Sequence, residues 1–302
     1  MNELRTGKVL KSLNGLCTIE SNGILTPCRI SPRLRYEGLR PICGDNVRFS
    51  LNEDGSGYIN EIDERKNVMI RPRIANTDIL VIVTAIVSPA PDRFIIDLMT
   101  ASAISEGIRP VIVINKCDLA DVSPLRDAYV SCGFDVFVTQ ANDPSGSNVS
   151  IEGLRRFLRG CTACFAGLSG VGKSSLLRSL YPYVSVEVGE LSRRIMRGKN
   201  TTRTTELYCV DEDTYVADSP GFGSLDAERF DLVRFEKLQE AFPEQERFAD
   251  KCRYSDCTHL TEEGCAVIAA AQQGLIPISR RESYTKLYRI LYEKKQCYVS
   301  KK

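Results

Sequence analysis

The stretch Gly167-Leu-Ser-Gly-Val-Gly-Lys-Ser174 decides the fold of this 302-residue chain. It fits the pattern G-x-x-x-x-G-K-[ST], and it lies between a predicted strand over 161–166 and a predicted helix that begins near Lys173. In that setting the glycines let backbone N–H groups surround phosphate oxygens, Lys173 reaches the outer phosphates, and the Ser174 hydroxyl can bind Mg²⁺. The motif therefore predicts a nucleotide-binding α/β domain, without saying which nucleotide.

Upstream of this loop, apolar runs alternate with helical patterns. The runs that predict buried strands are residues 79–86, 110–114 and 136–139. The stretches that predict helices are residues 92–105 and 124–132. Continuous apolar strands that alternate with helices are typical of a parallel sheet covered on both faces.

A second motif, Asn115-Lys-Cys-Asp118, directly follows one of these strands, at the edge of the sheet where ligands of open α/β folds bind. A carboxylate at Asp118 can accept two hydrogen bonds from guanine, and adenine lacks that pair of donors. Asn115 would brace the loop, and the stem of Lys116 would lie along the base. Alone the motif is weak, but beside a phosphate loop it indicates a guanine nucleotide.

Asp218-Ser-Pro-Gly221 forms a third motif, after a predicted hairpin over 206–210 and 214–217. Asp218 can hold Mg²⁺ through water, and the Gly221 N–H can contact the γ-phosphate. The polar segment 197–203 precedes the hairpin and could bring a Thr hydroxyl to the metal. We favour Thr202 over Thr201, and a merely solvated loop is the alternative.

Five short β-type runs between residues 7 and 72, separated by turns such as Asn14-Gly15 and Asn22-Gly23, predict an OB-like barrel. Such a barrel can bind oligonucleotides, although a β domain without a ligand remains open.

Near the other end of the chain, Cys252-x₄-Cys257-x-His259-x₅-Cys265 matches the Cys₃His set of structural zinc, and His259 is the only histidine. Four protein ligands leave no position for water, so we expect one structural zinc per chain. Cys161-x-x-Cys164 lies on the strand before the phosphate loop, and we interpret it and the remaining cysteines as packing residues.

The order of the motifs is informative. In ordinary small GTPases the phosphate loop comes first, whereas here 115–118 precede 167–174, which precede 218–221. With its barrel and zinc module, the chain resembles the bacterial, circularly permuted GTPases that depend on the small ribosomal subunit and assist its late assembly, the ribosome biogenesis GTPase A family. The resemblance covers nearly the whole length. It implies that Ala141 lies in a second base-contacting loop, although the usual Ser-Ala pair is missing.

Two positions bear on catalysis. Phe222 follows the third motif where many GTPases carry the Gln that orients water, so we expect slow hydrolysis by the protein alone. The resembled family also has a hydrophobic residue there but usually carries a His before the paired Thr, where this chain has Asn200. We expect Asn200 or a group of the ribosomal partner to position the water. The expected catalytic residues are Lys173, Thr202 and Asn200.

The candidate nucleotide-binding residues come from these motifs and their neighbours. They are Asn115, Lys116, Asp118, Ala141, Gly167, Ser169, Gly170, Val171, Gly172, Lys173, Ser174, Ser175, Asp218 and Gly221. The candidate magnesium ligands, acting with GTP, are Ser174, Thr202 and Asp218.

The last 23 residues read as a basic helix, with eight Lys or Arg against two Glu. We expect it to join the barrel in binding RNA, with a merely solvated face as the alternative. The residues proposed for this surface are Arg280, Arg281, Lys286, Arg289, Lys294 and Lys295. GTP would favour a conformation that holds RNA, and hydrolysis would release it.

Overall composition narrows the class of protein. Hydrophobic residues make up 43% of the chain, which excludes a disordered polymer. The chain has 40 basic and 39 acidic residues, so any contact with nucleic acid must come from local basic patches and not from the overall charge. The longest apolar run is too short to cross a bilayer, and no signal peptide is apparent. We therefore expect a cytoplasmic protein with no membrane partner. Nothing in the sequence demands an oligomer larger than a monomer.

Together these patterns predict a multidomain α/β protein. Its domains would be an OB-like RNA-binding barrel over 1–72, a circularly permuted GTPase domain over 73–243 and a zinc-binding helical module over 244–302. By the resemblance, it would hydrolyse GTP to GDP and phosphate, slowly alone and faster on the small (30S) ribosomal subunit, whose rRNA it binds while assisting late maturation. The main alternative is an RNA-binding scaffold with a structural or near-inactive nucleotide site. A P-loop kinase would leave residues 115–118 unexplained.

Overall fold

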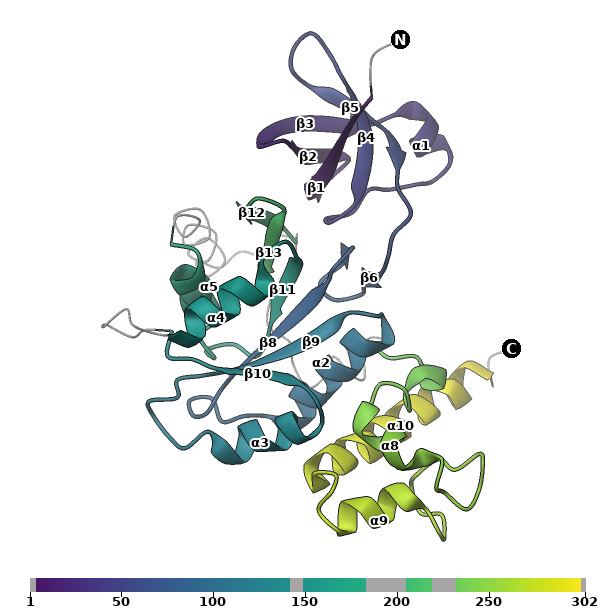
Figure 1. Cartoon of the computed structure of the whole chain (residues 1–302). Coiled ribbons are helices and arrows are strands. Elements are labelled where there is room, and N and C mark those ends of the chain that lie inside the picture. Colours follow the sequence, from purple (N-terminus) through teal and green to yellow (C-terminus); the bar gives the residue numbers. More distant parts are fainter. Residues whose placement is uncertain (1–3, 142–148, 183–204, 219–231, 300–302) are drawn as a thin grey trace. The chain divides into compact units, whose positions relative to one another are not determined.

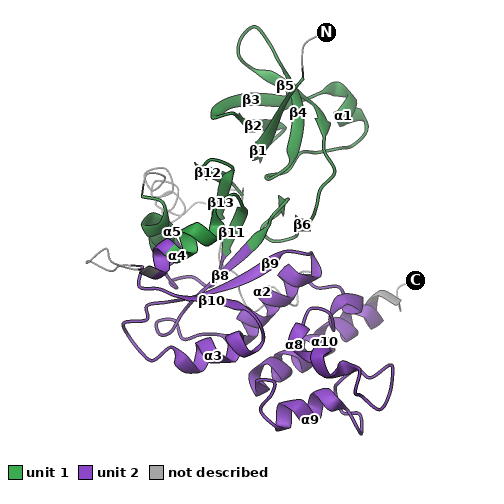
Figure 2. Cartoon of the chain, in the orientation of Figure 1, with its two compact units in different colours: residues 1–79, 153–165, 174–220 green, residues 80–152, 166–173, 221–302 purple. Residues whose placement is uncertain are grey.

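A computed structural model describes residues 4–141, 149–182, 205–218 and 232–299. The chain divides into two compact units (Figure 2). The first contains residues 1–79, 153–165 and 174–220, and the second contains residues 80–152, 166–173 and 221–302. Each unit draws on separate stretches of sequence.

The N-terminal part of the first unit is a closed five-stranded barrel with strand order β1-β2-β3-β5-β4 (Figure 1). Its strands are β1 (Arg5–Leu13), β2 (Leu16–Ser21), β3 (Ile24–Ile30), β4 (Asn46–Leu51) and β5 (Gly57–Ile62). Asn14 and Asn22 take positive φ angles of 50° ahead of glycines, which is the turn chemistry that the sequence predicted. The expectation of an OB-like barrel is confirmed. A short helix, α1 (Pro32–Tyr36), was not predicted.

Alternate side chains of the barrel strands fill its interior. The buried core residues are Val9, Cys17, Ile19, Cys28, Leu34, Val47, Phe49 and Ile59. A two-stranded ladder of β6 (Val68–Met69) and β7 (Ile74–Ala75) follows the barrel.

The central sheet has six strands in the order β10-β9-β8-β11-β13-β12. They are β8 (Ile79–Ala85), β9 (Arg109–Asn115), β10 (Asp135–Val138), β11 (Thr162–Ala166), β12 (Leu207–Asp211) and β13 (Thr214–Asp218). β9 pairs with β10 and β11 pairs with β13 in parallel, whereas β12 and β13 form an antiparallel hairpin. Every residue of β8 and β11 is buried, as expected for strands covered on both faces.

The helices of the nucleotide-binding region follow the predicted alternation with strands. They are α2 (Arg93–Ser105), α3 (Ser123–Ser131), α4 (Val149–Leu158) and α5 (Lys173–Leu180). Asp92 caps α2 by accepting a hydrogen bond from the Ile95 N–H. The α4 helix was not predicted.

Two side-chain contacts within the first unit join the barrel to the β12–β13 hairpin. The Lys11 ammonium lies 3.0 Å from a Glu206 carboxylate oxygen. The Tyr215 hydroxyl donates a 2.6 Å hydrogen bond to Glu20, which is only 8% exposed. A buried carboxylate needs such donors, so this contact fixes the hairpin against the barrel.

The C-terminal part of the second unit is helical. It contains a 3₁₀ turn, η1 (Phe235–Lys237), and the helices α8 (Pro243–Ala249), α9 (Ala266–Gln272) and α10 (Ile278–Val299). The amphipathic spacing of residues 225–242 predicts a helix, but this prediction is wrong for the described part, residues 232–242, which holds only the 3₁₀ turn. Phe235 packs edge-on against Tyr288 of α10, and this tertiary contact outweighs the local preference for a helix. The described residues contain no helix that is long and apolar enough to span a membrane.

Candidate nucleotide and metal sites

The phosphate-loop motif lies between β11 and α5, as the sequence predicted. Gly167 has φ 149° and Gly172 has φ 97°. A Cβ atom on Gly167 would lie 2.1 Å from the Val83 carbonyl oxygen, and one on Gly172 would lie 2.2 Å from the side-chain nitrogen of Asn115. Backbone angles and space both require glycine at these two positions.

Lys173 folds back over the loop that precedes it. It is 9% exposed, and its ammonium group donates to the carbonyl oxygens of Gly167 (2.8 Å) and Leu168 (3.0 Å). These two hydrogen bonds hold the Lys173 ammonium group inside the loop. From this position the ammonium group could also donate to phosphate oxygens of a bound nucleotide.

Asn115 connects the loops of the site. It closes β9, is 2% exposed, and donates from its side chain to the Val171 carbonyl at 2.9 Å. Its side-chain oxygen accepts from the Thr139 hydroxyl (3.2 Å) and the Ala141 N–H (3.0 Å). One amide therefore fixes the phosphate loop, the guanine motif and the loop after β10 relative to each other.

Lys116 makes a second connection to the phosphate loop. It has a positive φ of 62°, and its ammonium group donates to the Gly170 carbonyl at 2.9 Å and to the Ser88 carbonyl. Asp118 follows it as an exposed residue, without an ion pair or hydrogen bond among the described residues. Its carboxylate is thus available as an acceptor at the edge of the site.

Asp218 closes β13 and pairs in register with Phe165 of β11, the strand that leads into the phosphate loop. Parallel pairing brings the carboxyl ends of the two strands together. Ser174, in the first turn of α5, offers a hydroxyl, and a hydroxyl with a carboxylate is a donor set that suits Mg²⁺. Thr201, Thr202, Asn200, Gly221 and Phe222 lie outside the described residues.

Cys164 lies at the centre of β11 and is fully buried, and burial raises the pKa of its thiol. A thiol kept protonated is a poor nucleophile and metal ligand. This agrees with the interpretation of Cys164 as a packing residue. Cys161 is only half-buried, and the same interpretation is wrong for Cys209 and Cys297, which are exposed.

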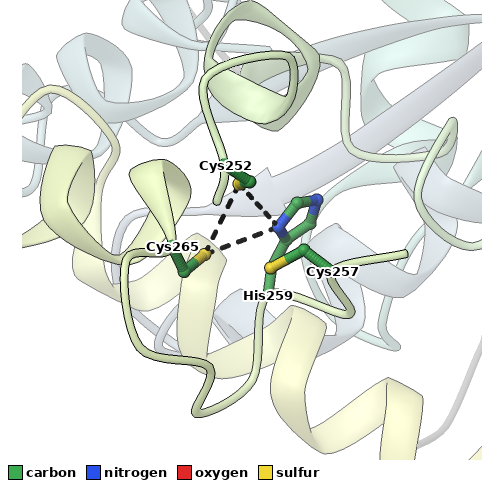
Figure 3. Close-up of side chains that lie close together, drawn as sticks. All are labelled: Cys252, Cys257, His259 and Cys265. Carbon is green, nitrogen blue, oxygen red and sulfur yellow. Dashed lines mark hydrogen bonds between the residues drawn. The ribbon is translucent and has the colours of Figure 1, made fainter. Parts of the chain in front are cut away.

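The four predicted metal ligands come together in the C-terminal part of the chain (Figure 3). The ligand atoms of Cys252, Cys257, His259 and Cys265 all lie within 4.8 Å of one another. His259 Nδ1 is 3.6 Å from the Cys252 sulfur and 3.5 Å from the Cys265 sulfur, and these sulfurs are 3.9 Å apart. Tetrahedral zinc bonds of ~2.3 Å to sulfur and ~2.0 Å to nitrogen place a sulfur and a nitrogen about 3.5 Å apart and two sulfurs about 3.8 Å apart, so the cluster fits a tetrahedral ion.

Glu262 organises the loop that carries His259, a role that sequence reasoning missed. Its carboxylate accepts hydrogen bonds from the N–H groups of Thr258 (2.7 Å), Leu260 (2.8 Å) and Thr261 (3.0 Å), and from the Thr258 hydroxyl. Burial alone would raise the pKa of this carboxyl, but these hydrogen bonds outweigh it and lower the pKa to about 2. The sequence did offer one indication of this role. Glu262 follows His259 by three residues, and a carboxylate at that spacing can accept hydrogen bonds from the backbone N–H groups of the loop between them.

Helix α10 holds the same loop from the other side. Arg281 donates to the carbonyl oxygens of His259 and Leu260, each at 2.8 Å, and the Tyr284 hydroxyl donates to the Thr258 carbonyl at 2.8 Å. Burial lowers the pKa of His259, which favours the neutral imidazole that binds metal.

The expectation that Arg280 belongs to an RNA-binding surface is wrong. Arg280 is 1% exposed, and its guanidinium bonds Asp97 of α2 at 2.9 Å and Glu244 of α8 at 2.8 Å. Two other basic residues of α10 also contact the protein itself: the Lys286 ammonium lies 3.9 Å from the centre of the Phe94 ring, and Lys295 pairs with Glu236 at 2.8 Å. Counting charges along a helix does not reveal which face is buried.

A phosphate loop preceded in the chain by its guanine motif defines a circularly permuted P-loop GTPase. The sequence model of the RsgA GTPase family matches residues 62–228, and that of the RsgA N-terminal domain matches residues 6–59. The chain therefore belongs to the RsgA GTPase family.

Known relatives match over nearly the whole chain. The small ribosomal subunit biogenesis GTPase RsgA of Alkaliphilus metalliredigens is 37% identical over 286 residues, covering 93% of this chain and 96% of the relative. The protein of that name from Bacillus cereus is 36% identical, with 97% and 99% covered. The crystal structure of YjeQ from Thermotoga maritima has a TM-score of 0.78 at 33% identity, covering 96% of this chain and 99% of that one. YloQ, described as a circularly permuted GTPase, has a TM-score of 0.78 at 27% identity, with 97% and 96% covered.

Proposed function

We propose that this protein hydrolyses GTP to GDP and phosphate and assists the maturation of the small ribosomal subunit. The observation that carries the proposal is the bonding of Asn115 and Lys116 to the phosphate loop. These contacts join a guanine-type motif and a phosphate-type motif at one place, so a single nucleotide can span both. The names of the relatives supply the ribosomal part.

Each described residue of the site has a proposed role. The Asp118 carboxylate accepts the two donors of guanine, and Lys173 exchanges its loop carbonyls for the outer phosphates. The backbone N–H groups of residues 169–175 surround the phosphate oxygens. Ser174 and Asp218 would hold Mg²⁺, which neutralises charge on the phosphates when it is bound with GTP.

Three predicted roles belong to residues that lie outside the described ones. Thr202 as a magnesium ligand, Gly221 as a γ-phosphate contact and Asn200 as the residue that positions water remain proposals. So do a single structural zinc on the Cys₃His cluster, a monomeric state, a cytoplasmic location and the release of rRNA on hydrolysis. The domain limits 1–72, 73–243 and 244–302 are likewise retained as predictions.

GTP turnover with and without purified small ribosomal subunits tests the proposal. We expect slow hydrolysis alone and at least about ten-fold faster hydrolysis with the subunits. Asp118→Ala should weaken GTP binding by about 10²-fold or more, since a site built for paired hydrogen bonds loses that discrimination with its acceptor. Turnover that the subunits leave unchanged would instead support the scaffold with a structural nucleotide.

Asp118→Asn is the sharper variant at the same position. Its amide offers one donor and one acceptor, which opposes guanine but matches xanthine, where a carbonyl replaces the amine. We expect the variant to prefer xanthosine triphosphate over GTP. A variant that still prefers GTP would show that Asp118 does not contact the base.

A further inference from the structure

The loop that joins β8 to α2, residues 86–92, lies beside both nucleotide motifs. The Ser88 carbonyl accepts a hydrogen bond from the Lys116 ammonium group, which also donates to the Gly170 carbonyl of the phosphate loop at 2.9 Å. A Cβ atom on Gly170 would lie 3.7 Å from the Pro89 side chain, so the two loops lie side by side. The joining loop therefore supplies one of the two acceptors that hold the lysine of the guanine motif.

The joining loop has little hydrogen-bonded structure of its own. The N–H of its first residue, Ile86, donates to the Asn115 carbonyl at 3.2 Å, but residues 87–91 form no backbone–backbone hydrogen bond with any other described residue. Pro89 and Pro91 have no N–H group to donate. The position of the Ser88 carbonyl is therefore set by the elements at the two ends of the loop, β8 and the first turn of α2.

Helix α10 holds this first turn of α2 by two side-chain contacts at the surface. Arg93, the first residue of α2, donates to the Ser279 hydroxyl at 3.1 Å. The Lys286 ammonium group lies 3.9 Å from the centre of the Phe94 ring, close enough for a cation–π interaction. Both contacts come from the first three turns of α10 and reach the two residues of α2 nearest to the joining loop.

A buried contact between the same two helices fixes the orientation of α2. Asp97 is 1% exposed and Thr100 is fully buried, and Arg280 donates to both at 2.9 Å. The Tyr129 hydroxyl donates to the same Asp97 oxygen at 2.9 Å, and the other carboxylate oxygen has no hydrogen-bond partner among the described residues. A buried carboxylate that loses its cation turns towards water, so the orientation of α2 about its axis depends on Arg280.

We propose that Ser279, Arg280 and Lys286 are positioning residues for guanine-nucleotide binding. Through α2 they fix the Ser88 carbonyl, and this carbonyl holds the Lys116 side chain where it lies along the base. The inference rests on the proposed function and deepens it, because it adds a determinant of nucleotide affinity that lies on α10 and in none of the nucleotide motifs. By thermodynamic linkage, a bound nucleotide strengthens the docking of α10 on α2 by the same factor.

Binding of fluorescently labelled GDP to the full chain tests the proposal. R280K keeps the charge but loses the planar fork that bonds α2 and α8 together, and it should weaken GDP binding about ten-fold. S279A/K286A removes the two surface contacts and should weaken GDP binding about three-fold. The matched control is R247A, which loses an exposed cation and its 3.2 Å hydrogen bond to the carbonyl of Ser131, the last residue of α3. It should change the affinity less than about two-fold, because this contact is remote from the joining loop.

Two readouts separate positioning from a loss of structure. Displacement of labelled GDP by pyrophosphate reports on the phosphate loop alone, and the inhibition constant should agree within about two-fold in all variants. In the Lys116→Ala background, R280K should not weaken GDP binding further, because the side chain through which α10 acts is then absent. Thermal melts followed by circular dichroism show whether R280K is folded, and S279A/K286A carries the test if it is not.

GDP affinity that falls as far in R247A as in R280K would overturn the proposal, since the effect would then come from weakened docking in general. Equal losses of GDP and pyrophosphate binding, or additive losses from R280K and Lys116→Ala, would also overturn it. Unchanged GDP binding in both R280K and S279A/K286A would overturn this inference alone. An unaltered protein that binds no GDP would instead sink the proposed function, and this inference with it.

Discussion

Replacing Gly172 by alanine tests the central geometry of the nucleotide site. The added Cβ would lie 2.2 Å from the side-chain nitrogen of Asn115, so that side chain must move and its bond to the Val171 carbonyl must break. A non-glycine residue at positive φ costs about 1–2 kcal/mol. Leaving buried hydrogen-bonding groups without partners costs a further ~1–3 kcal/mol.

Gly170 provides the matched control within the same loop. Its φ is 82°, but a Cβ there would meet only the Pro89 side chain at 3.7 Å, an ordinary contact. Gly170→Ala should therefore lower the free energy of unfolding by about 1–2 kcal/mol, from the backbone angle alone. Gly172→Ala should lower it by about 2–5 kcal/mol, from the angle and the lost hydrogen bond together.

Urea unfolding followed by circular dichroism measures both variants, because the chain contains no tryptophan for fluorescence. Affinity for labelled GDP should fall further in Gly172→Ala than in Gly170→Ala. Asn115→Ala should cost less in the Gly172→Ala background than in the unaltered protein, since the bond to the Val171 carbonyl is then already lost and the clashing atom is removed. Equal destabilisation of the two glycine variants, within about 0.5 kcal/mol, would refute the reasoning.

Three more predictions follow from other contacts. His259→Ala should lose the bound zinc, measured as metal content per chain, and lower the thermal midpoint; retained metal would show that the cluster is not the site. Tyr215→Phe should lower the free energy of unfolding by about 1–3 kcal/mol because the buried Glu20 carboxylate loses a donor, and an unchanged urea midpoint would contradict this. Burial lowers the pKa of Lys8 below 10.5, so charged Lys8 opposes folding near neutral pH and the penalty disappears as pH rises towards 10.5. Lys8→Met should therefore stabilise the protein at pH 7 and progressively less above the lowered pKa; a gain that does not vary with pH would exclude this cause.

The position of the phosphate-loop and guanine-type motifs at strand ends, and the clustering of the Cys₃His residues, could be predicted from the sequence because each motif is contiguous or closely spaced. Local rules were sufficient for the phosphate loop, for Asn115 to Asp118 behind a strand, and for the ligand spacing from Cys252 to Cys265. Asn-Gly turns at regular spacing likewise predicted the barrel.

The features that could not be predicted from the sequence depend on contacts between elements that are distant in the chain. Arg280 sits in a basic stretch, and only the packing of α2 and α8 shows that its charge is internal. Residues 232–242 have enough apolar side chains for a helix, but contact with α10 overrides that pattern.

The position of Arg280 also limits how the chain can be divided. A protein cut after residue 243 would lose this guanidinium, and Asp97 would remain in the interior of α2 with no cation beside it. Stranding a buried charge in this way costs several kcal/mol. The helical part after residue 243 therefore cannot be removed without cost, because its Arg280 neutralises a buried carboxylate of α2.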